Sequence, residues 1–121
     1  MSGSSSLARP EIQAELISEA LVSASVGFLV WDEDRRYIAA NKAACEILGT
    51  TLEELLGQRV GDHTHEGIDQ IDTALAKGFS TGRAEVERFD GSGRVKIAYS
   101  TFTTKTAGMP FMATVIAPAP D

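Results

Sequence analysis

Apolar residues near the start of the chain recur with the spacing of an α-helix. On a helical wheel they fall within about half of the circumference, and Ser18 and the neighbouring glutamates lie outside that arc. Pro10 suits the first turn of a helix, so the pattern predicts an amphipathic helix over residues 10–25. An exposed apolar stripe of this size is unfavourable on a monomer, which predicts that the helix mediates self-association. The stripe consists of Ile12, Leu16, Ile17 and Leu21.

The rest of the chain contains five segments with strand patterns. Residues 27–32 and 111–117 are apolar on both faces, which predicts two central strands. Residues 37–40 follow a charged turn, and residues 83–87 and 95–100 alternate with period two around a glycine-rich turn, which predicts a hairpin. Pairing the two central strands gives a five-stranded antiparallel sheet in the order 2-1-5-4-3.

Three short helices are predicted between the second and third strands. Asn41 and Thr51 are suited to cap the first two, and Thr51 also begins a capping box with Glu54. The third has an apolar face and ends at Gly78. The fold class is therefore α+β, with these short helices on one face of the sheet and the N-terminal helix as the natural cover of the other face.

Composition limits the classes of partner. The 121 residues predict a single domain, and 17 acidic against 11 basic residues give a formal net charge of −6, which argues against a nucleic-acid partner. The apolar runs are far shorter than the roughly 20 residues that span a bilayer, so no membrane partner is expected. Cys45 is a single cysteine and the start lacks the features of a secretory signal, so we expect a cytoplasmic protein.

Segment composition also predicts the boundaries of the domain. Residues 1–9 resemble a tag or a disordered segment, and residues 118–121, rich in alanine and proline, resemble the remnant of a linker. Between them we expect the helix at 10–25 and a folded core at 26–117.

Motifs placed along these elements resemble the PAS family of sensory domains, over residues 18 to 117. The resemblance implies a five-stranded antiparallel sheet with a helical flank, within a larger signalling protein whose effector domain follows on the C-terminal side. The motifs are Gly27–Asp34, Ala40–Ala44, Ile47–Gly49, Leu55–Gly57 and Asp90–Gly91.

Two positions depart from the family pattern. Arg35 stands where the turn after the first strand usually has glycine, which puts the shape of that turn in doubt. The last strand often ends in Asp-Ile-Thr, whose aspartate helps to couple it to the next helix. Ala117–Ala119 stands there instead, so the usual output coupling is also in doubt.

The resemblance further implies a small-molecule pocket or a packed core between the sheet and the helices. Small inward residues leave room for an unidentified ligand, whereas Trp31, Tyr37 and Phe111 fill the same space in a purely structural dimerisation module. The implied pocket residues are Leu29, Trp31, Tyr37, Ala39, Ile47, Ile68, Ile71, Leu75, Ala84, Val86, Ala98, Ser100, Phe111, Ala113 and Val115.

His65 raises the alternative of a haem-based gas or redox sensor. In oxygen-sensing haem PAS domains a histidine at the start of this helix, in a His-Asp-Gly-Tyr-like stretch, ligates the iron, and the sequence at residues 65–68 is similar. Many PAS domains without haem also have a histidine near this position, and a solvated loop histidine is the alternative interpretation. The cofactor is thus unknown, with none expected first and haem second.

Other chemical motifs are weaker. Residues 62–66 contain metal-ligand residue types without zinc-site spacing, so no metal is expected. Cys45 lacks the surrounding sequence of the flavin-adduct cysteine in light-oxygen-voltage domains, and is expected to act as a small apolar residue. Asp32 and Asp34 are expected to shape a turn rather than to act as an acid–base pair.

The resemblance to PAS domains implies a non-catalytic regulatory domain, and the apolar stripe of the N-terminal helix predicts that it forms a homodimer through that helix. A small cone-shaped α+β enzyme is a further alternative, and it requires an acid or base inside the cavity. Tyr37 is the titratable group that we expect there.

Overall fold

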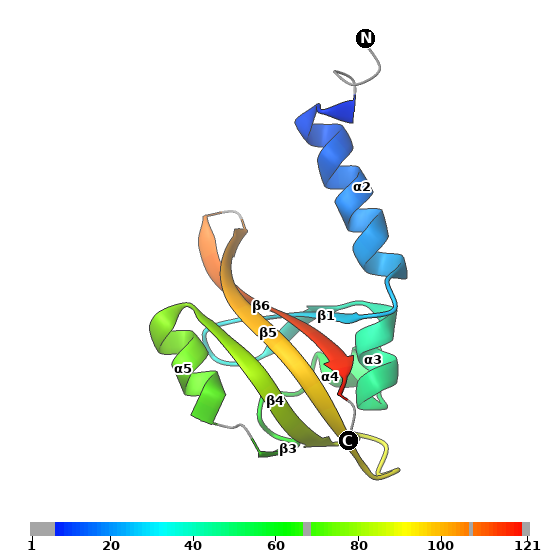
Figure 1. The fold of residues 1–121 in the computed structure, drawn as a ribbon, viewed down its shortest axis with the longest axis vertical. Helices are drawn as coiled ribbons and strands as arrows, with labels where there is room; N and C mark the ends of the chain where they lie inside the picture. Colours follow the sequence, from blue (N-terminus) through cyan, green and yellow to red (C-terminus); the bar gives the residue numbers. More distant parts are fainter. Residues whose placement is uncertain (1–6, 67–68, 107, 120–121) are drawn as a thin grey trace.

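The computed structural model describes residues 7–66, 69–106 and 108–119 (Figure 1). Apart from the short strand β3, helices and strands follow one another in the order that the hydrophobic pattern predicts, and Asn41 and Thr51 cap the helices expected of them. The elements are α2 (Pro10–Ser23), β1 (Gly27–Trp31), β2 (Tyr37–Ala40), α3 (Lys42–Leu48), α4 (Leu52–Leu55), β3 (Thr64–Glu66), α5 (Asp69–Lys77), β4 (Phe79–Glu87), β5 (Arg94–Thr106) and β6 (Met109–Pro118).

The strands form one antiparallel sheet in the order β2-β1-β6-β5-β4-β3. With β3 set aside, this is the predicted order 2-1-5-4-3, and the predicted fold class is confirmed. The central strands β1 and β6 pair along their length, as expected for segments that are apolar on both faces. The sequence does not predict β3, because residues 64–66 are polar, and this short strand extends the edge of the sheet beside β4. β6 continues through Pro118, one residue beyond the expected end of the core.

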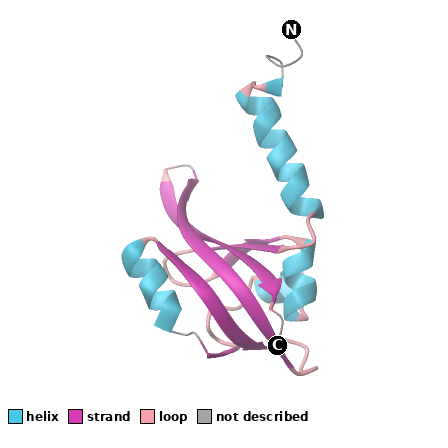
Figure 2. Cartoon of the chain, viewed as in Figure 1, coloured by secondary structure: helices cyan, strands magenta, loops and turns pink. Residues whose placement is uncertain are grey.

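The short helices α3, α4 and α5 lie on one side of the sheet, whereas α2 projects away from it (Figures 1 and 2). The expectation that α2 covers the other face is wrong, because the chain is extended at Ala24 and directs the helix past the sheet. The side chains of Leu16 and Ile17 are consequently 47% and 57% exposed. None of the helices in the described ranges is long and apolar enough to cross a bilayer.

Asn41 joins the base of α2 to the sheet and to α3. Its side-chain oxygen accepts hydrogen bonds from the backbone N–H groups of Phe28 at 2.9 Å and Ala44 at 3.0 Å. Its amide nitrogen donates to the carbonyl oxygens of Leu21 at 2.6 Å and Val26 at 3.0 Å. One buried side chain therefore ties three segments together, beyond the capping role that the sequence predicts.

β1 and α3 approach each other closely at Gly27. A Cβ atom there would lie 2.5 Å from Cγ1 of Ile116 and 2.9 Å from Cα of Ala44. Glycine is needed at this position because the backbones leave no room for a side chain. The close contact fixes the position of α3 against the centre of the sheet.

The turn between β1 and β2 is built around Asp32 and Arg35. The Asp32 carboxylate accepts hydrogen bonds from the N–H groups of Asp34 and Arg36, both at 2.9 Å, which is the turn role expected of it. Arg35 has a φ of 69°, in the left-handed region, and is alone in this among the described non-glycine residues. The usual glycine is thus replaced without changing the handedness of the turn.

Candidate functional site

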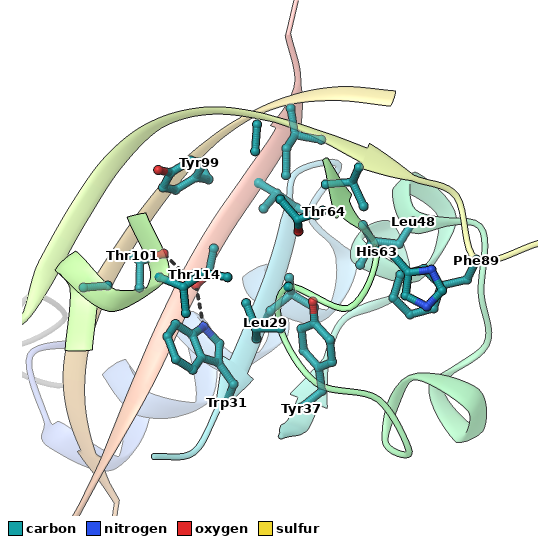
Figure 3. Close-up of a pocket in the computed structure, with 18 residues that line it drawn as sticks. Leu29, Trp31, Tyr37, Leu48, His63, Thr64, Phe89, Tyr99, Thr101 and Thr114 are labelled. Atoms are coloured by element: carbon teal, nitrogen blue, oxygen red, sulfur yellow. Dashed lines mark hydrogen bonds between the residues drawn. The ribbon is translucent and has the colours of Figure 1, made fainter. Parts of the chain in front are cut away.

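A cavity of about 80 Å³ lies between the sheet and the helices (Figure 3). Residues of all six strands line it, together with residues of α3, α5 and the segments that follow α4 and β4. The lining is Leu29, Trp31, Tyr37, Leu48, Val60, Gly61, His63, Thr64, Ile71, Ala74, Ala84, Val86, Phe89, Ile97, Tyr99, Thr101, Thr114 and Ile116.

A chain of hydrogen bonds crosses the sheet wall of the cavity. The indole N–H of Trp31 donates to Oγ1 of Thr114 at 2.9 Å, and this hydroxyl lies 2.8 Å from that of Thr101 (Figure 3). Through these hydrogen bonds the buried polar groups pair with one another. They therefore make the packing more specific and leave no donor among them unpaired.

The Tyr99 side chain, on β5 near these hydrogen bonds, does not take part in them. Its hydroxyl oxygen is buried and has no hydrogen-bond partner among the described residues. Gly82 on the paired strand β4 makes room for the ring, since a Cβ there would lie 3.2 Å from the Tyr99 hydroxyl. A buried hydroxyl without a partner costs about 1–3 kcal/mol, so this atom favours an added hydrogen-bonding group in the cavity.

Aromatic side chains line the opposite side of the cavity. The His63 ring stacks on that of Phe89 with 3.9 Å between their centroids. The backbone holds both in place, because the N–H of Glu87 donates to the His63 carbonyl at 2.7 Å and that of Phe89 donates to the Leu48 carbonyl at 2.9 Å. Burial, and secondarily the Asp62 carboxylate, raises the pKa of the nearby Tyr37 hydroxyl above its usual range.

Several of the expected pocket residues line the cavity. On the strands they occupy inward positions of β1, β2 and β4, and on α5 one of them closes the cavity from the helical side. They are Leu29, Trp31, Tyr37, Ala84, Val86 and Ile71.

The expected inward positions on β5 and β6 are wrong. β5 turns Ile97, Tyr99 and Thr101 toward the cavity, and β6 turns Thr114 and Ile116 toward it. The predicted set belongs to the opposite face because side chains alternate along a strand and the prediction was out of phase by one residue. The misassigned residues are Ala98, Ser100, Phe111, Ala113 and Val115.

Three other expected positions also fall outside the cavity lining. A bulge in the β1–β2 pairing sets Trp31 opposite Tyr37 and Val30 opposite Ala39, which leaves Ala39 exposed. Ile47 packs against the core cluster, but Leu48 takes the lining position. Leu75 on α5 is exposed because the smaller Ala74 faces the sheet, and Ile68 lies outside the described residues.

The hydrophobic pattern of the sequence does not identify His63, Thr101, Thr114 or Tyr99 as lining residues. For Tyr99 the sequence does contain a signal. Ile97 and Tyr99 lie two residues apart, and the polar residues Lys96 and Ser100 take the alternate positions. The two threonines carry no such signal, because they become buried only through their bonds to each other and to the Trp31 indole.

The residues present do not fit haem or flavin. Ligands of drug size or larger occupy clefts of about 300–1,000 Å³, and the cavity has about 80 Å³. His65 lies in β3 and its side chain is outside the described part of the structure. Cys45 is buried on α3 away from the cavity lining, and burial, followed by the neighbouring Glu46, raises the pKa of its thiol. Among the described residues, no three histidine, cysteine, aspartate or glutamate side chains are grouped to hold a metal ion.

An ion pair fastens α5 over the cavity. The Arg35 guanidinium in the β1–β2 turn contacts the carboxylate of Asp72 on α5, and Ile71 and Ala74 of the same helix line the cavity. The Arg35 carbonyl also accepts a 2.7 Å hydrogen bond from the N–H of Val60, a lining residue. The turn thereby positions two walls of the cavity.

Solved structures of other proteins share this arrangement of strands and helices. The three solved structures that follow are 17–20% identical to the chain, so they show the fold alone. A PAS domain of an HTR-like protein from Haloarcula marismortui matches with a TM-score of 0.75 and 17% identity over 90% of this chain and 93% of that one. A domain of a sensor histidine kinase/response regulator from Geobacter sulfurreducens matches with a TM-score of 0.72 and 18% identity, over 91% and 97%. An RNA-binding light-oxygen-voltage receptor matches with a TM-score of 0.77 and 20% identity, over 93% of this chain and 35% of that one.

Sequence comparison gives the family directly. The comparison with curated protein sequences returns no match. The family model described as the PAS fold matches residues 21–104, which is more than half of the chain. The chain therefore belongs to the PAS family.

Proposed function

We propose that this PAS domain is a sensory domain that binds a small molecule in the cavity and reports its occupancy through a dimer formed by α2. The coarser part of this function, a sensory or regulatory domain, agrees with the similar domains from sensor histidine kinases and from a nitrogen regulation protein. The finer part rests on the chemistry of the chain's own residues.

The observation that carries the proposal is the exposed apolar side of α2. Leu16 and Ile17 are about half exposed on a helix whose main contacts with the rest of the domain are with α3. An apolar stripe without cover favours a partner, and a second copy of the same helix supplies a matching one. Asn41 links the base of α2 to β1, whose Leu29 and Trp31 line the cavity. A ligand in the cavity and the position of α2 are thus connected through the contacts of Asn41 with β1.

The missing family aspartate at the end of the last strand favours output through α2 rather than through a helix after β6. We place the effector domain in the same polypeptide and the domain in the cytoplasm. Ligand binding shifts such a dimer only if the ligand has different affinities for its two arrangements.

Two variants and light scattering test the role of α2. Leu16→Glu with Ile17→Glu places charge on the stripe, and we expect it to convert a dimer to a monomer. Ser18→Glu adds charge outside the stripe and should leave the dimer intact. A double variant that stays dimeric, or a wild-type protein that is monomeric at high micromolar concentration, would reject α2 as the interface.

A further inference from the structure

If the cavity is a ligand site, as proposed above, its lining limits the class of molecule that it can bind. We infer that it binds an uncharged molecule no larger than one six-membered ring, with a single hydroxyl or carbonyl group that bonds to the Tyr99 hydroxyl. Three observations lead to this class: the charge of the lining, the hydrogen-bond inventory and the size.

The described lining contains no aspartate, glutamate, lysine or arginine. An ion moved from water into such a site loses its hydration without gaining a charged partner, at a cost of several kcal/mol per ion. Apolar side chains such as Leu29, Ile71 and Ile116 make up most of the surface instead. An uncharged and mainly apolar ligand is therefore favoured.

One buried hydroxyl in the lining offers a hydrogen bond to a ligand. Trp31, Thr114 and Thr101 satisfy one another in the sheet wall. The Tyr99 hydroxyl, which both donates and accepts, has no partner among the described residues although its oxygen is buried. A single polar group on the ligand is enough to pair this hydroxyl.

The size of the cavity sets the upper limit. Benzene occupies an apolar cavity of about 150 Å³ in another protein, and the cavity here, at about 80 Å³, is smaller. A single ring fits only if the walls move outward, so one ring is the upper limit, and aromatic neighbours such as Trp31 and Tyr37 favour a planar ligand.

The test uses three probes of one shape: phenol, toluene and benzoate. Binding is followed by backbone amide chemical shifts of lining residues, with wild type, Tyr99→Phe and Ala84→Leu. Phenol should bind about two- to tenfold more tightly than toluene, the value of one hydrogen bond. Benzoate, which is charged, should bind at least about tenfold more weakly than phenol.

The variants separate the hydrogen bond from the space. Tyr99→Phe should remove the preference for phenol and leave toluene binding unchanged, which also shows that the cavity is intact. Ala84→Leu should weaken phenol and toluene alike, because its side chain occupies the cavity. Benzoate binding as tightly as phenol, or a preference for phenol that survives in Tyr99→Phe, overturns the inferred ligand class but leaves the cavity as a ligand site. No shift at lining residues with any probe overturns both.

Discussion

The side-chain amide of Asn41 donates to the carbonyl of Leu21 across 2.6 Å, so the last turn of α2 is held by a residue that also caps α3. The carbonyl groups in the last turn of a helix lack intrahelical donors, and the Asn41 amide supplies a donor to one of these carbonyls, that of Leu21. The same side chain accepts a bond from Phe28 in β1. The orientation of the projecting helix therefore depends on a residue within the folded core.

Two substitutions of Asn41 separate capping from anchoring. Asn41→Ala should lower the free energy of unfolding by about 2–4 kcal/mol, because an N-cap contributes about 1 kcal/mol and each further buried group left unpaired costs about as much again. Asn41→Asp keeps the oxygen that caps α3 but lacks the donor to Leu21. We expect it to retain more of the stability while hydrogen exchange speeds up in α2. Urea unfolding and amide exchange measure the two effects, and exchange in α2 of Asn41→Asp as slow as in the wild type would show that the anchor to Leu21 is unimportant.

Thr114 holds the hydrogen-bond chain of the cavity wall together. Thr114→Val keeps the shape but leaves the Trp31 indole N–H without an acceptor, and should cost about 1–3 kcal/mol in urea unfolding. Thr101→Val leaves the Trp31–Thr114 bond in place and should cost about 1 kcal/mol or less. A Thr101 variant as unstable as the Thr114 variant contradicts this order.

Arg35 combines an unfavourable backbone conformation with an ion pair. Arg35→Gly and Arg35→Ala both lose the contact with Asp72, which is largely exposed and contributes at most about 1 kcal/mol. They differ in the backbone, because glycine adopts the observed φ of 69° without strain. Thermal unfolding should therefore show the glycine variant more stable than the alanine variant by about 1 kcal/mol. Equal stabilities would mean that the turn relaxes when the side chain is shortened.

Tyr37 makes the protein sensitive to alkaline pH. Burial raises the pKa of its hydroxyl, so above the ordinary pKa of about 10 the unfolded chain releases this proton while the folded state keeps it. Stability should be constant with respect to this group below pH 10 and fall above it, by up to about 1.4 kcal/mol per pH unit. Tyr37→Phe should have a shallower fall in urea unfolding between pH 9 and 11. Cys45, whose thiol pKa is also raised, accounts for part of the fall that remains, and parallel slopes for wild type and Tyr37→Phe would refute the role of Tyr37.

Local signals predict the elements of this fold well. Helix caps, the proline at the start of α2 and the apolar runs of β1 and β6 are each contained in a few adjacent residues, and the structure places the corresponding elements where those signals indicate. The strand order follows because only two segments are apolar on both faces and must lie in the middle.

The faces of β5 and β6 depend instead on long-range pairing. β6 is apolar on both sides, and its polar Thr114 suggests an outward position by composition alone. In the sheet Thr114 pairs with Leu29, and cross-strand partners share a face, so the inward position of Leu29 requires Thr114 to be inward too. The register between strands distant in sequence is not contained in either segment, which is why the candidate site was predicted only in part.

The geometry of α2 has a mechanical consequence. Its 14 residues make a rod about 21 Å long that is held at one end, near Asn41. Rotating such a rod by about 10° at its base moves the far end by about 4 Å, roughly the separation of two hydrogen-bonded strands. Under the proposed sensory function, a displacement of β1 by a fraction of an ångström would therefore be enlarged along α2 into a movement of several ångströms at its far end.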